Sequence, residues 1–181
     1  MAWSLRTLKY GDMNQLSLTR INAKAPYRVV ASQEANVFHF ISESGVKFAI
    51  CFDESIMLTT IDTYELTIAN ANNRPSPRDV NMRETIACIV EEFFRVNELG
   101  LLYICETGDN KQSMRNRLFT AWFDYFNQKN EYEIISESLQ DDEGIENFAA
   151  LILRKDNPNF DAYIKEFCST ADFFKDKPSY E

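Results

Sequence analysis

Five cationic side chains lie close to the starts of two predicted helices, and they are Arg74, Arg78, Arg83, Lys111 and Arg115. One helix is expected to begin near Asn81 and the other near Asp109. The first N–H groups of a helix have no partner within it, and the helix dipole adds partial positive charge, so a helix N-terminus attracts anions. The cluster therefore predicts a site for a small anionic ligand. In the alternative interpretation the cations form ordinary ion pairs with neighbouring carboxylates, namely Asp79, Glu84 and Asp109.

Nucleophilic and metal chemistry have little support in the sequence. His39 is the single histidine, and it alternates with two phenylalanines in a predicted strand, which favours a structural role. No two of the four cysteines have the spacing of a zinc or redox motif, so we expect buried free thiols. The acidic run at residues 141–143 lacks the alternating ligands of an EF-hand loop and is typical of a solvated turn. We therefore predict no metal site.

Composition excludes several further classes of protein. The five glycines form neither a G-x-G-x-x-G nor a G-x-x-x-x-G-K-[ST] motif, which excludes Rossmann and P-loop nucleotide binding. The net charge of −9 argues against nucleic acid or an acidic membrane surface as a partner. The sequence has no secretory signal and no apolar run long enough to span a membrane, so we expect a cytoplasmic protein. A chain of 181 residues is expected to form a single domain, residues 1–181.

The pattern of apolar residues predicts strands that alternate with helices. Strands rich in β-branched and aromatic residues are expected at residues 36–41, 46–52, 63–69, 101–105, 132–138 and 148–153. Apolar residues at helical spacing predict three helices, which start near residues 81, 109 and 157. Residues 1–26 show little periodicity and receive no element, and residues 175–181 are expected to fray.

The expected ends of the helices rest on residue types with known terminal preferences. A capping box of Asn81 and Glu84 is expected to start the first helix, with Asp79 as the alternative cap. Gly100 is suited to a left-handed position at the end of that helix. Pro158 is expected in the first position of the last helix.

The order of these elements predicts the fold class. A strand at residues 63–69, a helix and a strand at residues 101–105 should form a parallel, right-handed β-α-β unit. Residues 101–105 are continuously apolar, as in a strand that is buried on both faces. Antiparallel hairpins are expected on either side of this unit. We therefore predict an α/β (α+β) fold with a mixed, mainly antiparallel sheet and one parallel unit.

Two segments carry a resemblance to known sequences. Residues 78–94 read RDVNMRETIACIVEEFF, and residues 103–123 read YICETGDNKQSMRNRLFTAWF. Together they resemble an uncharacterised family of proteins from Bacteroidetes-type bacteria. The resemblance extends over about residues 36–160 and implies no assigned activity.

The order of the elements separately resembles the later part of the GNAT acyltransferase fold, in which a helix and a splayed parallel strand follow antiparallel strands. This resemblance implies that acetyl-CoA or another acyl-CoA is the cofactor, and that the cations named above bind it. The loop at residues 70–81 would hold its pyrophosphate, residues 69–71 would pair with its pantetheine arm, and Asn110 would be a further contact. The activity implied is acyl transfer to an amine whose proton passes to a carboxylate such as Glu65. Tyr125 is the candidate nearest to the position of the general acid.

A second hypothesis is a non-catalytic α/β module that binds a protein partner or a small anion. Residues 70–99 contain no glycine, so the glycine signature with which the GNAT superfamily binds pyrophosphate is absent. A binding module needs neither this signature nor a general acid. The sequence therefore leaves an acyltransferase and a non-catalytic module as alternatives.

Overall fold

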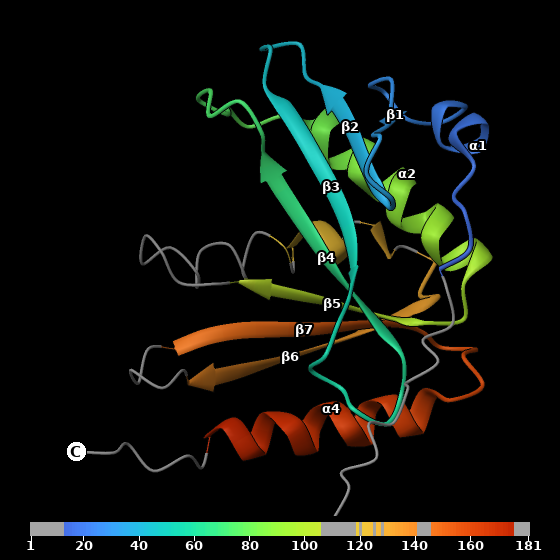
Figure 1. The fold of residues 1–181 in the computed structure, drawn as a ribbon, viewed down its shortest axis with the longest axis vertical. Helices are drawn as coiled ribbons and strands as arrows, with labels where there is room; N and C mark the ends of the chain where they lie inside the picture. Colours follow the sequence, from blue (N-terminus) through green and yellow to red (C-terminus); the bar gives the residue numbers. More distant parts are fainter. Residues whose placement is uncertain are drawn as a thin grey trace, which may run out of the picture.

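A seven-stranded sheet forms the centre of the computed structural model, which describes residues 13–105, 119, 121–124, 126–127, 129–140 and 146–175 (Figure 1). The strands lie side by side in the order β1 (Val30–Ala31), β2 (Val37–Ile41), β3 (Lys47–Glu54), β4 (Thr63–Asn70), β5 (Gly100–Cys105), β7 (Glu146–Arg154) and β6 (Tyr132–Gln140). Strands β4 and β5 are parallel, and the other neighbouring pairs are antiparallel. The predicted mixed sheet with one parallel unit is confirmed.

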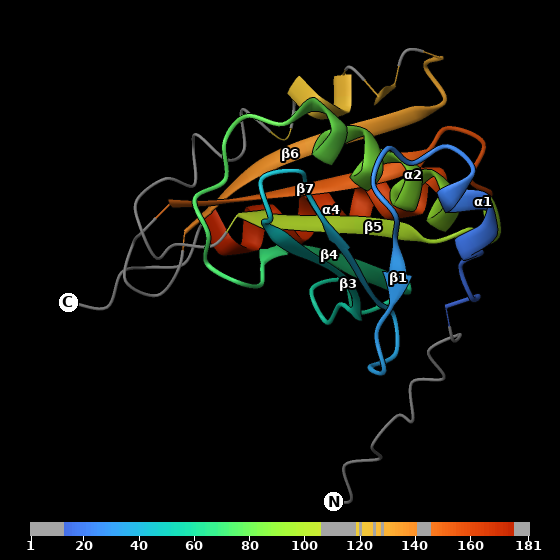
Figure 2. The same cartoon turned by 90° about the horizontal axis from the view of Figure 1, so that it is seen from above.

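Helices cover both faces of the sheet. Helix α2 (Val80–Val96) connects β4 to β5 on one face, and α4 (Phe160–Lys175) follows β7 on the other face (Figures 1 and 2). The short helix α1 (Leu18–Asn22) packs against α2. The described residues between 119 and 126 are also helical and lie on the α2 side. The sequence also predicts a helix that begins at Asp109. Residues 109–118 of this helix lie outside the described part of the chain.

Two hydrophobic cores lie on the two faces of the sheet, and β5 contributes to both. Leu101 belongs to the core beneath α2 and Leu102 to the core beneath α4, and both side chains are fully buried. Successive side chains of a strand point to opposite faces, so a strand between two cores must be apolar throughout. The expectation that residues 101–105 form a central strand is therefore confirmed. In β7, Ala150 and Leu151 divide between the two cores in the same way.

The N-terminus of α2 is capped by Asp79, so the prediction of an Asn81 cap is wrong. The Asp79 carboxylate accepts a 3.0 Å hydrogen bond from the backbone N–H of Met82 and a 2.9 Å hydrogen bond from the hydroxyl of Tyr27. An aspartate in the extended conformation suits this position because its short side chain reaches the first N–H groups of the helix. Tyr27 fixes the carboxylate from a distant part of the chain, and this contact decides between the two caps.

Two further expectations about helix ends are wrong. Helix α2 ends at Asn97, whose backbone N–H and side-chain amide both donate to the carbonyl of Phe93, and Gly100 already lies in β5. Helix α4 begins at Phe160, and Pro158 lies in the preceding turn, where Asn157 accepts a 2.8 Å hydrogen bond from the backbone of residue 159. In both places an asparagine side chain forms a hydrogen bond with the backbone at the helix end.

Candidate functional site

The parallel strands β4 and β5 separate after a short paired stretch. They pair in register at Thr63 with Gly100, Tyr64 with Leu101 and Glu65 with Leu102. Beyond these pairs β4 stays hydrogen-bonded to β3, and β5 stays hydrogen-bonded to β7. Because each strand follows its antiparallel neighbour, the two diverge toward their C-terminal ends (Figure 1). We call the space between β4 after Glu65 and β5 after Leu102 the β4–β5 opening.

A large groove meets the β4–β5 opening on the face of the sheet that α4 covers. Its volume is about 1120 Å³, which is slightly above the usual range of about 300–1,000 Å³ for small-molecule sites. Its walls are the segment between β3 and β4, the sheet and α4, and the described residues that line them include Ile56, Met57, Glu65, Ile104, Lys165 and Phe173. We call this cavity the α4 groove. It touches both strands of the opening, through Glu65 of β4 and Ile104 of β5.

Glu65 occupies the position where the opening begins. It is the last residue of β4 that pairs with β5, and its half-buried side chain lines the α4 groove. In the antiparallel pair of β3 and β4, Glu65 lies directly opposite Asp53, and directly opposite residues point to the same face of a sheet. Two carboxylates therefore lie next to each other at the mouth of the opening. This side of the opening therefore carries acidic side chains from both β3 and β4.

Helix α4 is held against the opening by Tyr163 and Glu166. The Tyr163 hydroxyl donates a 2.6 Å hydrogen bond to the backbone carbonyl of Asp62, and its ring packs on Gly100. The Glu166 carboxylate accepts hydrogen bonds from the backbone N–H groups of Thr59 at 2.6 Å and Thr60 at 2.8 Å, and one from the Thr60 hydroxyl. These contacts fix the segment between β3 and β4 on α4. They therefore shape the α4 groove, which sequence spacing alone did not reveal.

Comparison with known sequences identifies the family of this chain. Residues 78–169 match DUF6169, a family of unknown function. The chain belongs to this family. No curated protein and no solved structure matches the chain. The expectation of an uncharacterised family is thus confirmed.

The DUF6169 segment contributes one side of the site. It runs from the start of α2 through β5, β6 and β7 to residue 169 of α4. Ile104 and Lys165 of the α4 groove lie inside this segment, whereas Ile56 and Glu65 precede it. The β4–β5 opening is therefore formed between the family segment and the antiparallel strands that come before it in the chain.

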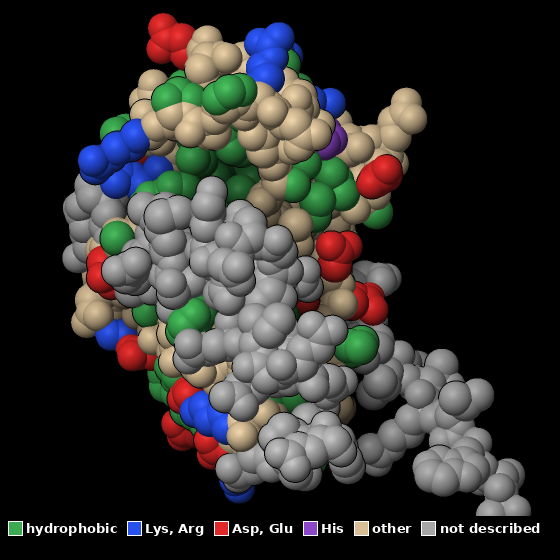
Figure 3. All heavy atoms as spheres, turned by 90° about the vertical axis from the view of Figure 1, so that its left-hand side faces the viewer, with side chains coloured by type: hydrophobic (Ala, Val, Ile, Leu, Met, Phe, Trp, Pro, Cys, Tyr) green, Lys and Arg blue, Asp and Glu red, His purple; other side chains and the backbone are tan. Residues whose placement is uncertain are grey.

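The three predicted cations that the structure describes lie in two places in the DUF6169 protein. The Arg74 guanidinium lies over Gly45 in the turn between β2 and β3, and Arg78 lines a shallow pocket with Glu43 and Ser44 of the same turn. Arg83 instead lines a small cavity between α2 and residues 119–126. Arg74 and Arg78 are thus brought to one turn and Arg83 is not. Seen from the side toward which β4 and β5 run, Lys and Arg side chains lie in both the upper and the lower part of this face, with acidic side chains nearby (Figure 3).

The remaining predicted residues lie outside the described part of the chain. They are Asp109, Asn110, Lys111, Arg115 and Tyr125, together with the acidic run at residues 141–143. A contribution of Lys111 and Arg115 to an anion site therefore stays a prediction.

The N-terminus of α2 already carries an internal anion. The Asp79 carboxylate accepts from the first turn of the helix, as described above. Pro75 and Pro77 in the loop before it have no backbone N–H groups to donate. An external anion at this helix end would meet a carboxylate in place of free N–H groups. This observation supports the structural alternative for the cations near α2.

Cys51 and Cys88 show no sign of activation as nucleophiles. Burial raises the pKa of the Cys51 thiol, and the negative charge of Asp53 raises it further. Burial likewise raises the pKa of Cys88. A nucleophilic thiol needs the opposite shift. Within the described residues, no group of three histidine, cysteine, aspartate or glutamate side chains could hold a metal ion, and no helix is long and apolar enough to cross a membrane.

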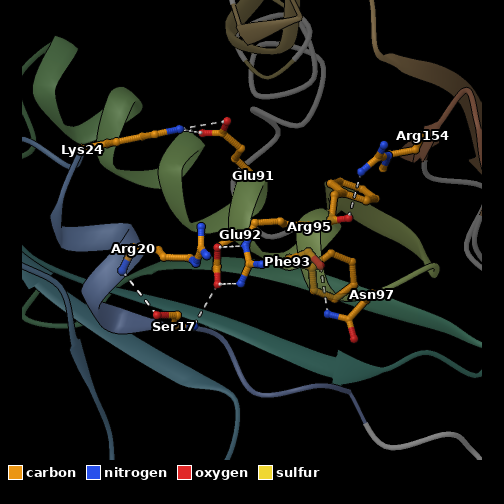
Figure 4. A network of polar contacts seen from close by, with 10 residues as sticks. Ser17, Arg20, Lys24, Glu91, Glu92, Phe93, Arg95, Asn97 and Arg154 are labelled. Carbon is orange, nitrogen blue, oxygen red and sulfur yellow. Dashed lines mark hydrogen bonds and ion pairs between the residues drawn. The ribbon is translucent and has the colours of Figure 1, made fainter.

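A polar network on the α2 side has a structural role. Glu92 is buried, and its carboxylate forms a two-point ion pair with Arg95 and accepts from the backbone N–H of Ser17 (Figure 4). The hydrogen bonds from Arg95 hold the pKa of Glu92 below its ordinary value, although burial opposes the shift. Lys24 pairs with Glu91 in the same region (Figure 4). These contacts join α1 to α2 and satisfy the charges that they bury.

Proposed function

We propose that this DUF6169 protein is a GNAT-like N-acyltransferase domain that transfers an acyl group from acyl-CoA to an amine. The observation that carries the proposal is the parallel β4–β5 pair, which ends after three register positions at Glu65 and Leu102. The element order is the one that the GNAT resemblance implies, namely antiparallel strands, a helix, a splayed parallel strand, a helical segment and a closing hairpin. The proposal places the thioester arm of the acyl-CoA in the β4–β5 opening.

The chain supplies backbone and acid–base groups for this reaction. Among the described residues, β4 makes no pairs with β5 from Leu66 to Asn70, so its edge can pair with the amide groups of a pantetheine arm. The amine nitrogen attacks the thioester carbonyl, a C–N bond forms and the C–S bond breaks. Glu65 accepts the proton that the amine loses, and the leaving thiolate takes up a proton to become the CoA thiol. The products are an amide and CoA.

Binding of acetyl-CoA provides the first test. A ligand at 100 times its Kd stabilises a protein by about 2.7 kcal/mol, which for a chain of this length raises Tm by about 5–10 °C. We expect such a shift with acetyl-CoA and a smaller one with acetate. No shift at millimolar acetyl-CoA would overturn the proposal.

Release of the CoA thiol in the presence of amines provides the second test. We expect Glu65→Gln to lower kcat by about 100-fold or more, which is the usual effect of removing a general base. Glu98→Gln is the matched control, because Glu98 is exposed at the far end of α2 and lines neither the opening nor the groove. Equal rates for Glu65→Gln and the unmodified protein would exclude Glu65 as the base.

A non-catalytic binding module is the second candidate, and the position of the exposed Arg74 and Arg78 at one turn favours it. In this function the exposed Arg74 and Arg78, in a loop stiffened by two prolines, bind an anion or an acidic segment of a protein partner. Acetyl-CoA would then leave Tm unchanged. Arg78→Glu should abolish binding of such a partner while it leaves the free energy of unfolding nearly unchanged, because the side chain is exposed.

A further inference from the structure

The α4 groove exposes apolar side chains that a folded protein normally covers. Ile56 is 85% exposed and Phe173 is 65% exposed, and they are the two most exposed large hydrophobic residues in the described part of the chain. Both line the α4 groove, together with Met57, Ile104 and Leu139. Exposed apolar side chains that gather in a concave site indicate a ligand with an apolar body.

The same groove carries carboxylates on its sheet wall. Glu65 lines it, and Asp53 lies directly opposite Glu65 on the same face of the sheet. A third carboxylate, Glu166, is engaged by the segment between β3 and β4. Lys165 is the only cation among the described lining residues. The groove therefore presents negative charge next to its apolar walls, which complements a ligand that is cationic at one end.

We propose that the α4 groove binds an amphipathic primary amine, with its apolar body against Ile56 and Phe173 and its ammonium group beside Glu65. The identification of this amine as the acceptor of acyl transfer rests on the proposed function. Glu65 belongs to both the groove and the β4–β5 opening. An ammonium group bound there lies beside the carboxylate that would remove its proton and at the place where the thioester arm would end.

Two features of the groove argue against other ligands. A fatty acid would fit the apolar walls, but its carboxylate would meet Glu65 and the neighbouring Asp53. A small amine such as methylamine would match the carboxylates but leave Ile56 and Phe173 exposed. The combination selects a ligand that has both a positive charge and an apolar body.

Calorimetric titration of the full chain with octylamine, octanoate and methylamine tests the proposal in the absence of acyl-CoA. We expect octylamine to bind with one site and at least about tenfold more tightly than octanoate, because the two share a chain length and differ in the sign of their charge. We expect methylamine to bind about 100-fold more weakly than octylamine if half of the octyl chain is buried.

Variants with matched controls locate the site. Ile56→Ala should weaken octylamine binding about tenfold, whereas Ile41→Ala, which truncates an isoleucine 62% exposed on β2 away from the groove, should not change it. Glu65→Gln should reduce the preference for octylamine over octanoate, and Glu98→Gln should leave this preference as it is. Both alanine replacements lie on the surface, so the free energies of unfolding should remain similar.

The outcomes separate this inference from the proposed function. Octylamine binding without acetyl-CoA binding would retain the amine site and exclude acyl transfer. Acetyl-CoA binding without octylamine binding would exclude the amine site alone. Equal affinities for octylamine and octanoate, or equal effects of Ile56→Ala and Ile41→Ala, would overturn the assignment of the α4 groove to an amphipathic amine.

Discussion

Replacing Gly100 by alanine should destabilise the protein, because α4 leaves no space for a side chain at that position. A Cβ atom at Gly100 would lie 2.8 Å from Cε1 of Tyr163, 3.0 Å from its Cδ1 and 3.2 Å from Cδ1 of Leu151. Carbon atoms in contact are normally about 3.5–4.0 Å apart. The Tyr163 ring is 1% exposed, and its hydroxyl is bonded to the carbonyl of Asp62, so the ring cannot move aside at low cost.

Two effects of opposite sign determine the size of the loss. Overpacking of a core typically costs about 1–3 kcal/mol. A glycine-to-alanine change also restricts the unfolded chain, which stabilises a protein by about 0.4–1 kcal/mol where the backbone accepts alanine. Gly100 lies in β5 and outside the left-handed region, so this gain applies. We expect a net loss of about 1–2 kcal/mol and a decrease of Tm by about 2–8 °C.

Urea unfolding of a double-mutant cycle isolates the contact with Tyr163. Gly100→Ala should lower the free energy of unfolding in the unmodified protein but not in the Tyr163→Ala background, where the ring is absent. We expect a coupling of at least about 1 kcal/mol. Gly45→Ala is the control, since Gly45 has a φ of +78° and its strain does not involve Tyr163. If Gly100→Ala costs the same free energy in both backgrounds, the steric argument is wrong.

Three further predictions concern charged and buried polar groups. Glu166→Ala removes the hydrogen-bond acceptor that anchors the segment between β3 and β4. It should lower the free energy of unfolding by about 1 kcal/mol and speed proteolysis of that segment. An unchanged cleavage rate would contradict this role of Glu166. The hydrogen bonds from Arg95 lower the pKa of Glu92 from its ordinary value of 4.5. The pair therefore stabilises the fold above pH 4.5, and this contribution to the free energy of unfolding is lost as the pH falls through the lower pKa of the folded state. The free energy of unfolding of Glu92→Gln should therefore depend less on pH in the acid range. Burial raises the pKa of Tyr132 to about 12 from 10.0, so stability should decrease as the pH rises between these values; tyrosinate absorbance that shows every tyrosine ionising near pH 10 would contradict this assignment.

The parts of the fold that sequence predicts are those in which neighbouring residues determine the structure. The apolar run of β5 reveals a strand buried on both faces because every residue of such a strand must be apolar. The helical spacing of apolar residues in α2 and the short connections to its strands similarly predict the parallel unit. Glu65 stays a candidate base that the GNAT resemblance implies, and the sequence does not show that β4 and β5 separate at this residue.

Contacts between distant segments explain what the sequence did not reveal. Helix α1 has five residues, too few for a periodic pattern, and it is held by the buried Ile21 and by the hydrogen bond from Ser17 to Glu92. Gly100 is required by the ring of Tyr163, whereas its sequence position next to a helix suggested a cap. In each case the decisive partner lies more than 60 residues away along the chain.

The α4 groove depends on two contacts that lie on one side of one helix. Tyr163 and Glu166 are three residues apart, so they face the same direction on α4. The first bonds to the carbonyl of Asp62 at the start of β4, and the second bonds to the segment that carries Ile56. Because Glu65 lies three residues after Asp62, the same contacts set the separation between the apolar wall and the carboxylates. A ligand that contacts only one of these features uses part of the groove, and this is why we propose an amphipathic amine in place of either a simple ammonium ion or a neutral apolar molecule.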